Sequence, residues 1–355
     1  MRIPGFNRYA PALYVAVAML AGCGGGTQSQ LAPAGPSQLP DGFVNLRTSG
    51  AARSDVVAVH PNRAQSWMAP GAATGDLLYI TDLAADDVLV YSYPGLKLVG
   101  TLTGFLNPDG ECTDKKGDVW IVNNQLSHAA EDAVEYKHGG TKPIATLEVG
   151  GGFAVSCSVD PTTGDIAVTD SETYGGGEGN LAIFAHGKGT PTFYEIPKFF
   201  YHYFCGYDPK GNLYIDGGSY NDVFEFAELP KGSKKFKNIT LKGAAINFGG
   251  NVQWDGKYVA VGEQEYQVVG SPPHDDSAVY QTTGAGGKIV HVTPLAGSMD
   301  VSGYWIDGKT VVGPSSPAFG SGAIVGFWNY PAGGKLTKKL TGFELAYGAA
   351  ISLAK

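Results

Sequence analysis

The chain has 355 residues, and its 33 Asp and Glu outnumber its 25 Lys and Arg, for a net charge of −8. This negative balance repels nucleic-acid phosphates, so we expect no nucleic-acid partner. Glycine occurs 52 times, about twice its usual frequency, and it separates many short apolar runs. Such a pattern predicts an all-β fold with tight turns.

The first 22 residues have the three zones of a secretory signal peptide. Arg2 and Arg8 supply positive charge, and residues 14–20 form a short apolar segment. That segment is too short to span a bilayer, which requires about 20 residues. The sequence Leu-Ala-Gly-Cys that ends at Cys23 then resembles the lipobox of bacterial lipoproteins.

The lipobox resemblance implies that cleavage precedes Cys23 and that acyl chains on this residue hold the protein in membrane lipid. Gly24, rather than Asp, follows the cysteine, and by resemblance to enterobacterial lipoprotein sorting this favours the outer membrane. We therefore expect a lipid-anchored protein of the cell envelope. The alternative is an ordinary signal peptide or a membrane helix with a chance cysteine.

Residues 23–65 are interpreted as the lipidated cysteine and a flexible tether. Residues 24–40 consist mostly of Gly, Gln, Ser, Ala and Pro, and they have too few apolar side chains to offset the entropy of ordering. Removal of residues 1–22 leaves a mature chain with a net charge of −10.

A short unit recurs six times in residues 66–355. Each copy has a turn that ends in Gly, then a polar residue and a short apolar strand, as in Gly117-Asp118-Val119-Trp120-Ile121. A further strand precedes the glycine and two more follow, so each copy predicts four antiparallel strands. Four-stranded units at this period indicate a six-bladed β-propeller. The anchor glycines are Gly75, Gly117, Gly164, Gly211, Gly256 and Gly308, with spacings of 42, 47, 47, 45 and 52 residues.

The first and fifth copies leave details open. Residues 347–353 at the end of the chain look like another first strand that would complete the first blade, but residues 66–68 precede that blade directly. In the fifth copy, the widest spacing indicates an insertion from Glu263 to about Thr283, and the strand after it is expected at residues 289–292. Such a loop carries either binding specificity or harmless extra length.

The repeated unit resembles the NHL-repeat and senescence-marker/gluconolactonase superfamily of propellers. The resemblance rests on an acid, two residues, Gly, Asn or Asp, and an apolar–aromatic–apolar strand, as in Asp208-Pro209-Lys210-Gly211-Asn212-Leu213-Tyr214-Ile215. It implies the fold far more than the function. In the lactonase family a Glu and Asn or Asp residues hold a divalent metal in the channel, which implies a hydrolase as an alternative function.

Polar residues lie at or near the end of the second strand in five copies. Carboxylates and amides at one level of a propeller channel could bind a hard divalent cation, the one cofactor that we consider. Alternatively, they hydrogen-bond nearby backbone at the strand ends. Gly313-Pro314 occupies the corresponding position of the sixth copy. The five candidates are Asp82, Asn123, Asp170, Asp216 and Glu263.

Three cysteines, Cys112, Cys157 and Cys205, fall in the first strands of three successive copies, which should line the channel. A three-thiolate metal site, a disulfide between two of them, and small apolar side chains at a crowded axis are the three interpretations. With Cys23 lipidated, an odd number of thiols remains, so one stays unpaired within the chain.

Residues 199–204, Phe-Phe-Tyr-His-Tyr-Phe, are the densest aromatic run in the chain. Within it, Phe200, Tyr201, His202 and Tyr203 are candidate ligand-binding residues, because aromatic rings at a channel mouth can stack on flat ligands. Alternate members could equally pack between blades, since large apolar side chains are usually buried.

No pattern for a nucleophile with its base occurs, because the seven His are scattered and G-x-S-x-G is absent. The sequence therefore favours a membrane-anchored propeller that binds an unidentified protein or small molecule without specific catalysis. A divalent-metal lactonase-type hydrolase is the alternative, and a structural envelope protein is the third possibility.

Replacement of Cys23 by Ser should abolish incorporation of labelled palmitate, because the acyl chains attach through this residue. The measurement is metabolic labelling of cells that express either form. Equal labelling of the two forms would contradict the lipoprotein interpretation.

Overall fold

The computed structural model describes residues 65–124, 131–150, 152–173, 176–243, 246–264, 276–316 and 322–355. These residues form strands and three short 3-10 helices, η1 (Ala72–Thr74), η2 (Ala185–Gly187) and η3 (Gly284–Gly286), and no α-helix occurs among them. Accordingly, the described part contains no helix with the length and apolar character to cross a membrane.

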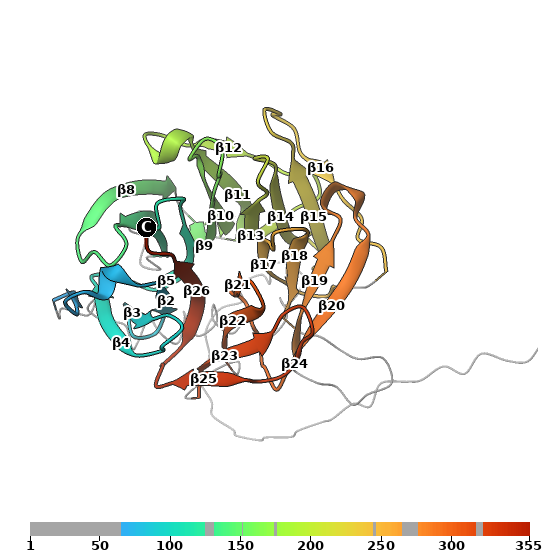
Figure 1. Cartoon of the computed structure of the whole chain (residues 1–355). Coiled ribbons are helices and arrows are strands. Elements are labelled where there is room, and N and C mark those ends of the chain that lie inside the picture. Colours follow the sequence, from blue (N-terminus) through green and yellow to red (C-terminus); the bar gives the residue numbers. More distant parts are fainter. Residues whose placement is uncertain are drawn as a thin grey trace, which may run out of the picture. The chain divides into compact units, whose positions relative to one another are not determined.

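Six antiparallel sheets form the blades of a propeller, as the sequence predicts, and each first strand contacts first strands of neighbouring blades (Figure 1). Blade one holds β26 (Ala346–Ser352), β2 (Leu77–Asp82), β3 (Asp87–Ser92), β4 (Leu98–Thr103) and β1 (Trp67–Met68). Blade two holds β5 (Pro108–Thr113), β6 (Val119–Asn123), β7 (Glu131–Tyr136) and β8 (Pro143–Gly150). Blade three holds β9 (Gly152–Val159), β10 (Ile166–Thr173), β11 (Gly177–Phe184) and β12 (Thr192–Tyr194).

The remaining three sheets complete the ring. Blade four holds β13 (Tyr201–Tyr207), β14 (Leu213–Gly218), β15 (Phe224–Leu229) and β16 (Lys237–Asn238). Blade five holds β17 (Gly249–Trp254), β18 (Val259–Glu263), β19 (Ser277–Thr282) and β20 (Ile289–Ala296), with β24 (Gly334–Lys335) parallel to β20. Blade six holds β21 (Trp305–Asp307), β22 (Thr310–Ser315), β23 (Ile324–Asn329) and β25 (Lys338–Thr341).

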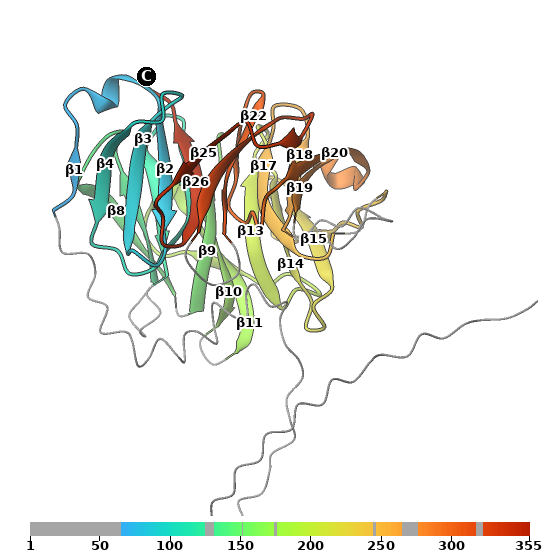
Figure 2. The same ribbon diagram turned by 90° about the horizontal axis from the view of Figure 1, so that it is seen from below.

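The strands run between the two faces of the propeller (Figure 2). Because successive strands alternate in direction, the turns between first and second strands share one face, which we call the hairpin face. The second strands end at the opposite face, which we call the loop face. The chain also passes from blade to blade at the loop face.

Both segments that competed for blade one belong to it, but in different places. The C-terminal strand β26 pairs with β2 along its length, from Leu77 opposite Ser352 to Asp82 opposite Ala346, so it takes the innermost position. Strand β1 adds two residues to the outer edge, beside β4. Ser352 Oγ also donates a hydrogen bond to the carbonyl of Gly117 in blade two. The last strand of the chain therefore closes the ring.

The anchor glycines explain why the repeat is visible in the sequence. Gly117 has a φ of 83°, a left-handed conformation that side chains rarely adopt, and it ends the turn between β5 and β6. Four other anchor glycines share a positive φ. Gly75 is the exception, with a φ of −127°, because the first strand of its blade arrives from the other end of the chain and no hairpin is needed.

A second set of glycines brings the inner strands together around the axis. A Cβ atom on Gly348 would lie 2.6 Å from the carbonyl oxygen of Asp109, and one on Gly110 would lie 2.4 Å from that of Val155. The inner strands therefore meet backbone to backbone at this level, where no side chain fits. The glycines of this kind are Gly110, Gly206, Gly250, Gly303 and Gly348, from five of the six blades.

The expected strand assignment in blade five is wrong. The third strand is β19 (Ser277–Thr282), inside the segment that we interpreted as an insertion, and β20 (Ile289–Ala296) is the fourth. All six residues of β19 are buried, so its Ser, Gln and Thr side chains lie in the interior and disguise the apolar pattern. Of the expected insertion, residues 265–275 lie outside the described residues.

Gly348→Ala should destabilise the fold by about 1–3 kcal/mol, because the added methyl group overlaps the backbone of blade two at the closing strand. Gly75→Ala is the matched control, since an added Cβ at that position has open space around it and an ordinary φ. The measurement is urea unfolding of both variants. Equal stabilities would show that the inner strands are not tightly packed.

Candidate functional site

The five polar residues near the ends of the second strands bind backbone within their own blades. Each accepts one or two hydrogen bonds from backbone N–H groups, which lie at or just before the start of the first strand in four blades and within β13 in blade four. Asp82 uses both carboxylate oxygens, at 2.7 and 2.8 Å. The donors are Glu344 and Leu345 for Asp82, Leu106 for Asn123, Phe153 for Asp170, Phe204 for Asp216, and Asn247 and Phe248 for Glu263.

Blade six repeats this arrangement with a different residue. Ser315 Oγ accepts a hydrogen bond of 2.8 Å from the backbone of Met299, so Ser315, and not Gly313-Pro314, is the equivalent residue. Further partners of these side chains include Asn180, which donates to Asp170, and Asp132, which accepts from Asn123. Burial raises the pKa of Asp216 well above its usual value, which favours the neutral acid. These contacts give the polar residues a structural role at the loop face.

The aromatic run is mostly interior. Phe199, His202, Tyr203 and Phe204 are buried, and Tyr203 packs against Phe248 of the next blade with ring centroids 5.2 Å apart. Two of the four candidate ligand-binding residues, His202 and Tyr203, therefore do not face solvent. Tyr203 serves the packing between blades, which is the second interpretation that the sequence left open. The buried His202 ring lies 5.5 Å from that of Phe199 between centroids.

The other two candidates form a partly exposed group with a residue that the sequence did not indicate. Phe200 lies edge-on to Tyr201 at 4.8 Å and to Tyr220 at 5.1 Å between ring centroids, and Tyr220 is 52% exposed. We call Phe200, Tyr201 and Tyr220 the aromatic platform. Tyr220 lies in the loop between β14 and β15, where a single aromatic residue produces no pattern. The platform lies at the loop face of blade four.

The platform is held by regular backbone contacts. The N–H of Phe200 donates a hydrogen bond of 2.7 Å to the carbonyl of Gly218. The carbonyl of Phe200 accepts a hydrogen bond of 2.8 Å from the N–H of Gly179 in blade three. The loop that carries Tyr220 is a tight turn in which Ser219 Oγ accepts from the backbone of Asn221 and Val223. These hydrogen bonds order the backbone that carries the three rings.

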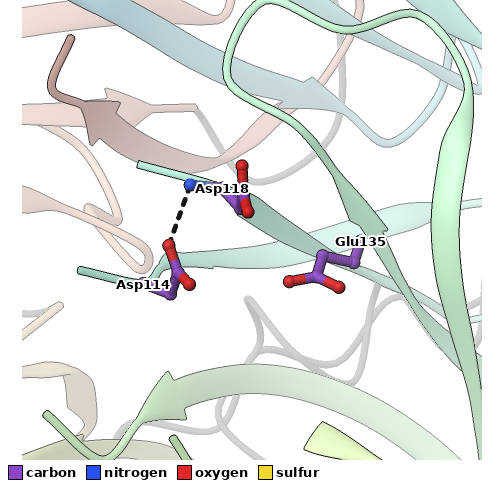
Figure 3. Close-up of side chains that lie close together, drawn as sticks. All are labelled: Asp114, Asp118 and Glu135. Atoms are coloured by element: carbon purple, nitrogen blue, oxygen red, sulfur yellow. Dashed lines mark hydrogen bonds between the residues drawn. The ribbon is translucent and has the colours of Figure 1, made fainter. Parts of the chain in front are cut away.

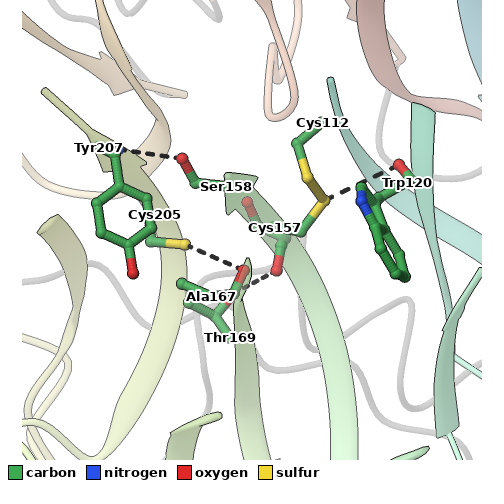
Figure 4. The surroundings of a disulfide bond; sticks show 9 residues. Cys112, Trp120, Cys157, Ser158, Ala167, Thr169, Cys205 and Tyr207 are labelled. Carbon is green, nitrogen blue, oxygen red and sulfur yellow. Dashed lines mark hydrogen bonds between the residues drawn. A yellow bond between two sulfur atoms is a disulfide. The ribbon is translucent and has the colours of Figure 1, made fainter. Parts of the chain in front are cut away.

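Of the three interpretations of the cysteines, the structure shows the disulfide between two of them. Cys112 of β5 and Cys157 of β9 form a disulfide that joins the inner strands of blades two and three (Figure 4). Cys205 is a buried thiol beside the carbonyl of Ala167, and burial raises its pKa well above the usual value. A three-thiolate metal site is incompatible with this pairing, since two of the sulfur atoms are oxidised.

Three carboxylates gather on the hairpin face of blade two (Figure 3). One carboxylate oxygen from each of Asp114, Asp118 and Glu135 lies within 4.8 Å of the other two, so the three could hold one metal ion. The Asp114 carboxylate accepts a hydrogen bond of 2.9 Å from the backbone N–H of Asp118, and it forms an ion pair of 3.6 Å with Lys116. Burial and both aspartates raise the pKa of Glu135. Asp114 thus caps the hairpin turn, and the cluster by itself identifies no ligand.

The fold and these sites define a six-bladed β-propeller with an exposed aromatic platform and an interior set of acids. No protein-family model matches the chain, and no curated protein matches it. Solved structures that resemble it share the fold alone, because their sequence identities are low.

A chain from a nidogen/laminin complex is 11% identical, with a TM-score of 0.60, over 79% of this chain and 100% of that one. TolB from Acinetobacter baumannii is 15% identical, with a TM-score of 0.55, over 86% of this chain and 71% of that one. Hydrazine synthase from Kuenenia stuttgartiensis is 14% identical, with a TM-score of 0.50, over 74% and 75% of the two chains.

His202 should make the fold less stable in acid. Burial lowers its pKa from 6.5 to about 3, and the nearby backbone of Phe200 offsets only part of this shift. Between these values the unfolded chain binds a proton that the folded chain does not, so stability is lost as the pH falls below 6.5.

His202→Phe tests this directly, because it places an aromatic ring without a titratable nitrogen at this buried position. The variant should match the wild type near pH 7.5 and gain on it by roughly 1.4 kcal/mol for each pH unit below 6.5. The measurement is urea unfolding at several pH values. Parallel stability curves would show that His202 titrates in the folded protein as it does in the unfolded chain.

Proposed function

We propose that this protein is an envelope lipoprotein, held in the outer membrane through acylated Cys23, whose propeller binds a partner protein through the aromatic platform. The observation that carries the proposal is the fixed group of Phe200, Tyr201 and Tyr220 on the loop face. Tyrosine and phenylalanine rings supply large contact area with little conformational entropy to lose, so they are enriched where proteins bind one another.

The surroundings of the platform support a protein partner. Val223, on the same loop as Tyr220, is 58% exposed, and the partly buried Phe224 and Tyr201 pack against a hydrophobic cluster that residues of several blades share. An apolar centre with tyrosine hydroxyl groups at its edge suits a protein interface. A propeller-like chain from a nidogen/laminin complex shows that a similar fold can occur in a protein complex.

A divalent-metal lactonase-type hydrolase is the second candidate function. Its expected ligands, Asp82, Asn123, Asp170, Asp216 and Glu263, accept hydrogen bonds from backbone N–H groups, so metal binding would have to replace those bonds. A rise in melting temperature with Ca²⁺, Zn²⁺ or Mn²⁺ would favour this function.

A photo-crosslinking amino acid at position 220 should capture a discrete partner in intact cells, because the side chain there lies in the proposed interface. The same amino acid at Val290, which is 39% exposed on blade five, is the control. Phe200→Ala in the position-220 form should reduce the cross-linked product at least about fivefold, since it removes the aromatic ring beside position 220 from the proposed interface. Identical products from positions 220 and 290 would contradict the proposal.

A further inference from the structure

A groove of about 850 Å³ lies along the outer side of blade three, within the size range of small-molecule sites. Strands β11 and β12, which lie next to each other in blade three (Figure 1), supply most of its lining. Lys234, from the connection between β15 and β16, completes it. The side chains that matter for its chemistry are Glu178, Asn180, Phe193, Tyr194, Glu195 and Lys234.

Phe193 gives the groove an aromatic surface. Its side chain is 52% exposed although it lies on a strand, β12, whose backbone pairs with β11 at Ala182. The ring lies against blade two, since a Cβ on Gly150 would be 3.7 Å from it. The neighbouring Tyr194 lies edge-on to Phe236 of blade four, with ring centroids 6.1 Å apart. A ring held in this way offers a fixed apolar face to a ligand.

The polar groups of the groove include both donors and acceptors. Glu178 and Glu195 supply carboxylate oxygens, and burial together with the charge of Glu195 raises the pKa of Glu178. Lys234 supplies an ammonium group. Asn180 Nδ2 donates a hydrogen bond of 3.0 Å to Asp170. Asn180 Oδ1 has no hydrogen-bond partner among the described residues.

We propose that this groove binds a short, uncharged oligosaccharide. The C–H face of a sugar ring packs on an aromatic ring such as Phe193, and its hydroxyl groups donate to Glu178 and Glu195 and accept from Lys234. A polyanion would be repelled by the two glutamates, and a polycation could pair with the glutamates but would leave Lys234 without a partner. An uncharged polyol satisfies all three groups at once.

The oligosaccharide groove and the aromatic platform are separate sites. The groove lies on the flank of blade three, and the platform lies on the loop face of blade four. The saccharide proposal therefore stands or falls independently of the protein partner.

The test uses the full-length acylated protein in detergent, with 4-fluorophenylalanine at position 193 and ¹⁹F NMR as the readout. Maltotetraose, cellotetraose and chitotetraose are the probes, and spermidine is the cationic comparison. At least one tetraose should move the position-193 resonance saturably. The Glu178→Gln/Glu195→Gln double variant should weaken that binding at least about tenfold, because it removes two charge-assisted acceptors.

The same label at Trp67, an aromatic residue that is 45% exposed on the outer edge of blade one, is the matched control and should not respond. Calorimetry with Phe193→Ala should show loss of binding, and circular dichroism should show that this exposed-site variant keeps its fold. No saturable shift with any tetraose, an equal response at position 67, undiminished binding to Phe193→Ala, or a response to spermidine alone would each overturn the proposal.

Discussion

The pairing of β26 with β2 is the interaction on which the rest of the structure depends. It joins the last strand of the chain to the first blade, so the ring of six sheets is closed by hydrogen bonds between segments that lie more than 260 residues apart. Asp82 strengthens the closure, because its carboxylate accepts hydrogen bonds from the N–H groups of Glu344 and Leu345, which directly precede β26. Without β26, the inner edge of β2 would be left unpaired, and an unpaired strand edge is a site where other chains can add.

Closure also explains what the axis of the propeller contains. Six inner strands reach the axis, and glycines such as Gly110 and Gly348 let neighbouring strands touch through their backbones. The disulfide between Cys112 and Cys157 joins β5 and β9 covalently, the same pair of inner strands that Gly110 brings together. Polar side chains near this region are consequently used to satisfy backbone groups at the starts of strands. The sequence shows these acids clearly, but it does not show what they bind.

Most of the fold could be predicted from the sequence because turns with left-handed glycines repeat at a regular spacing. Gly117 and its equivalents mark the hairpin between the first and second strands of their blades. Gly75 precedes the second strand of blade one, whose first strand comes from the other end of the chain, so no hairpin joins these two strands. The prediction failed at β19, where buried Ser, Gln and Thr side chains obscure the strand. It also could not choose a closing strand, since pairing between chain ends depends on tertiary structure and leaves no local pattern.

The candidate site was predicted in part, and the reason lies in strand geometry. In a regular strand alternate residues face opposite sides, so half of the aromatic run would face solvent. A register irregularity between His202 and Cys205 breaks this alternation, and His202, Tyr203 and Phe204 are all buried. Exposure is left to Phe200 and Tyr201, which precede the irregularity, and to Tyr220 from a separate loop. The five polar candidates near the ends of the second strands bind backbone N–H groups, so the part of the predicted site that reaches the surface is the aromatic group at the loop face of blade four.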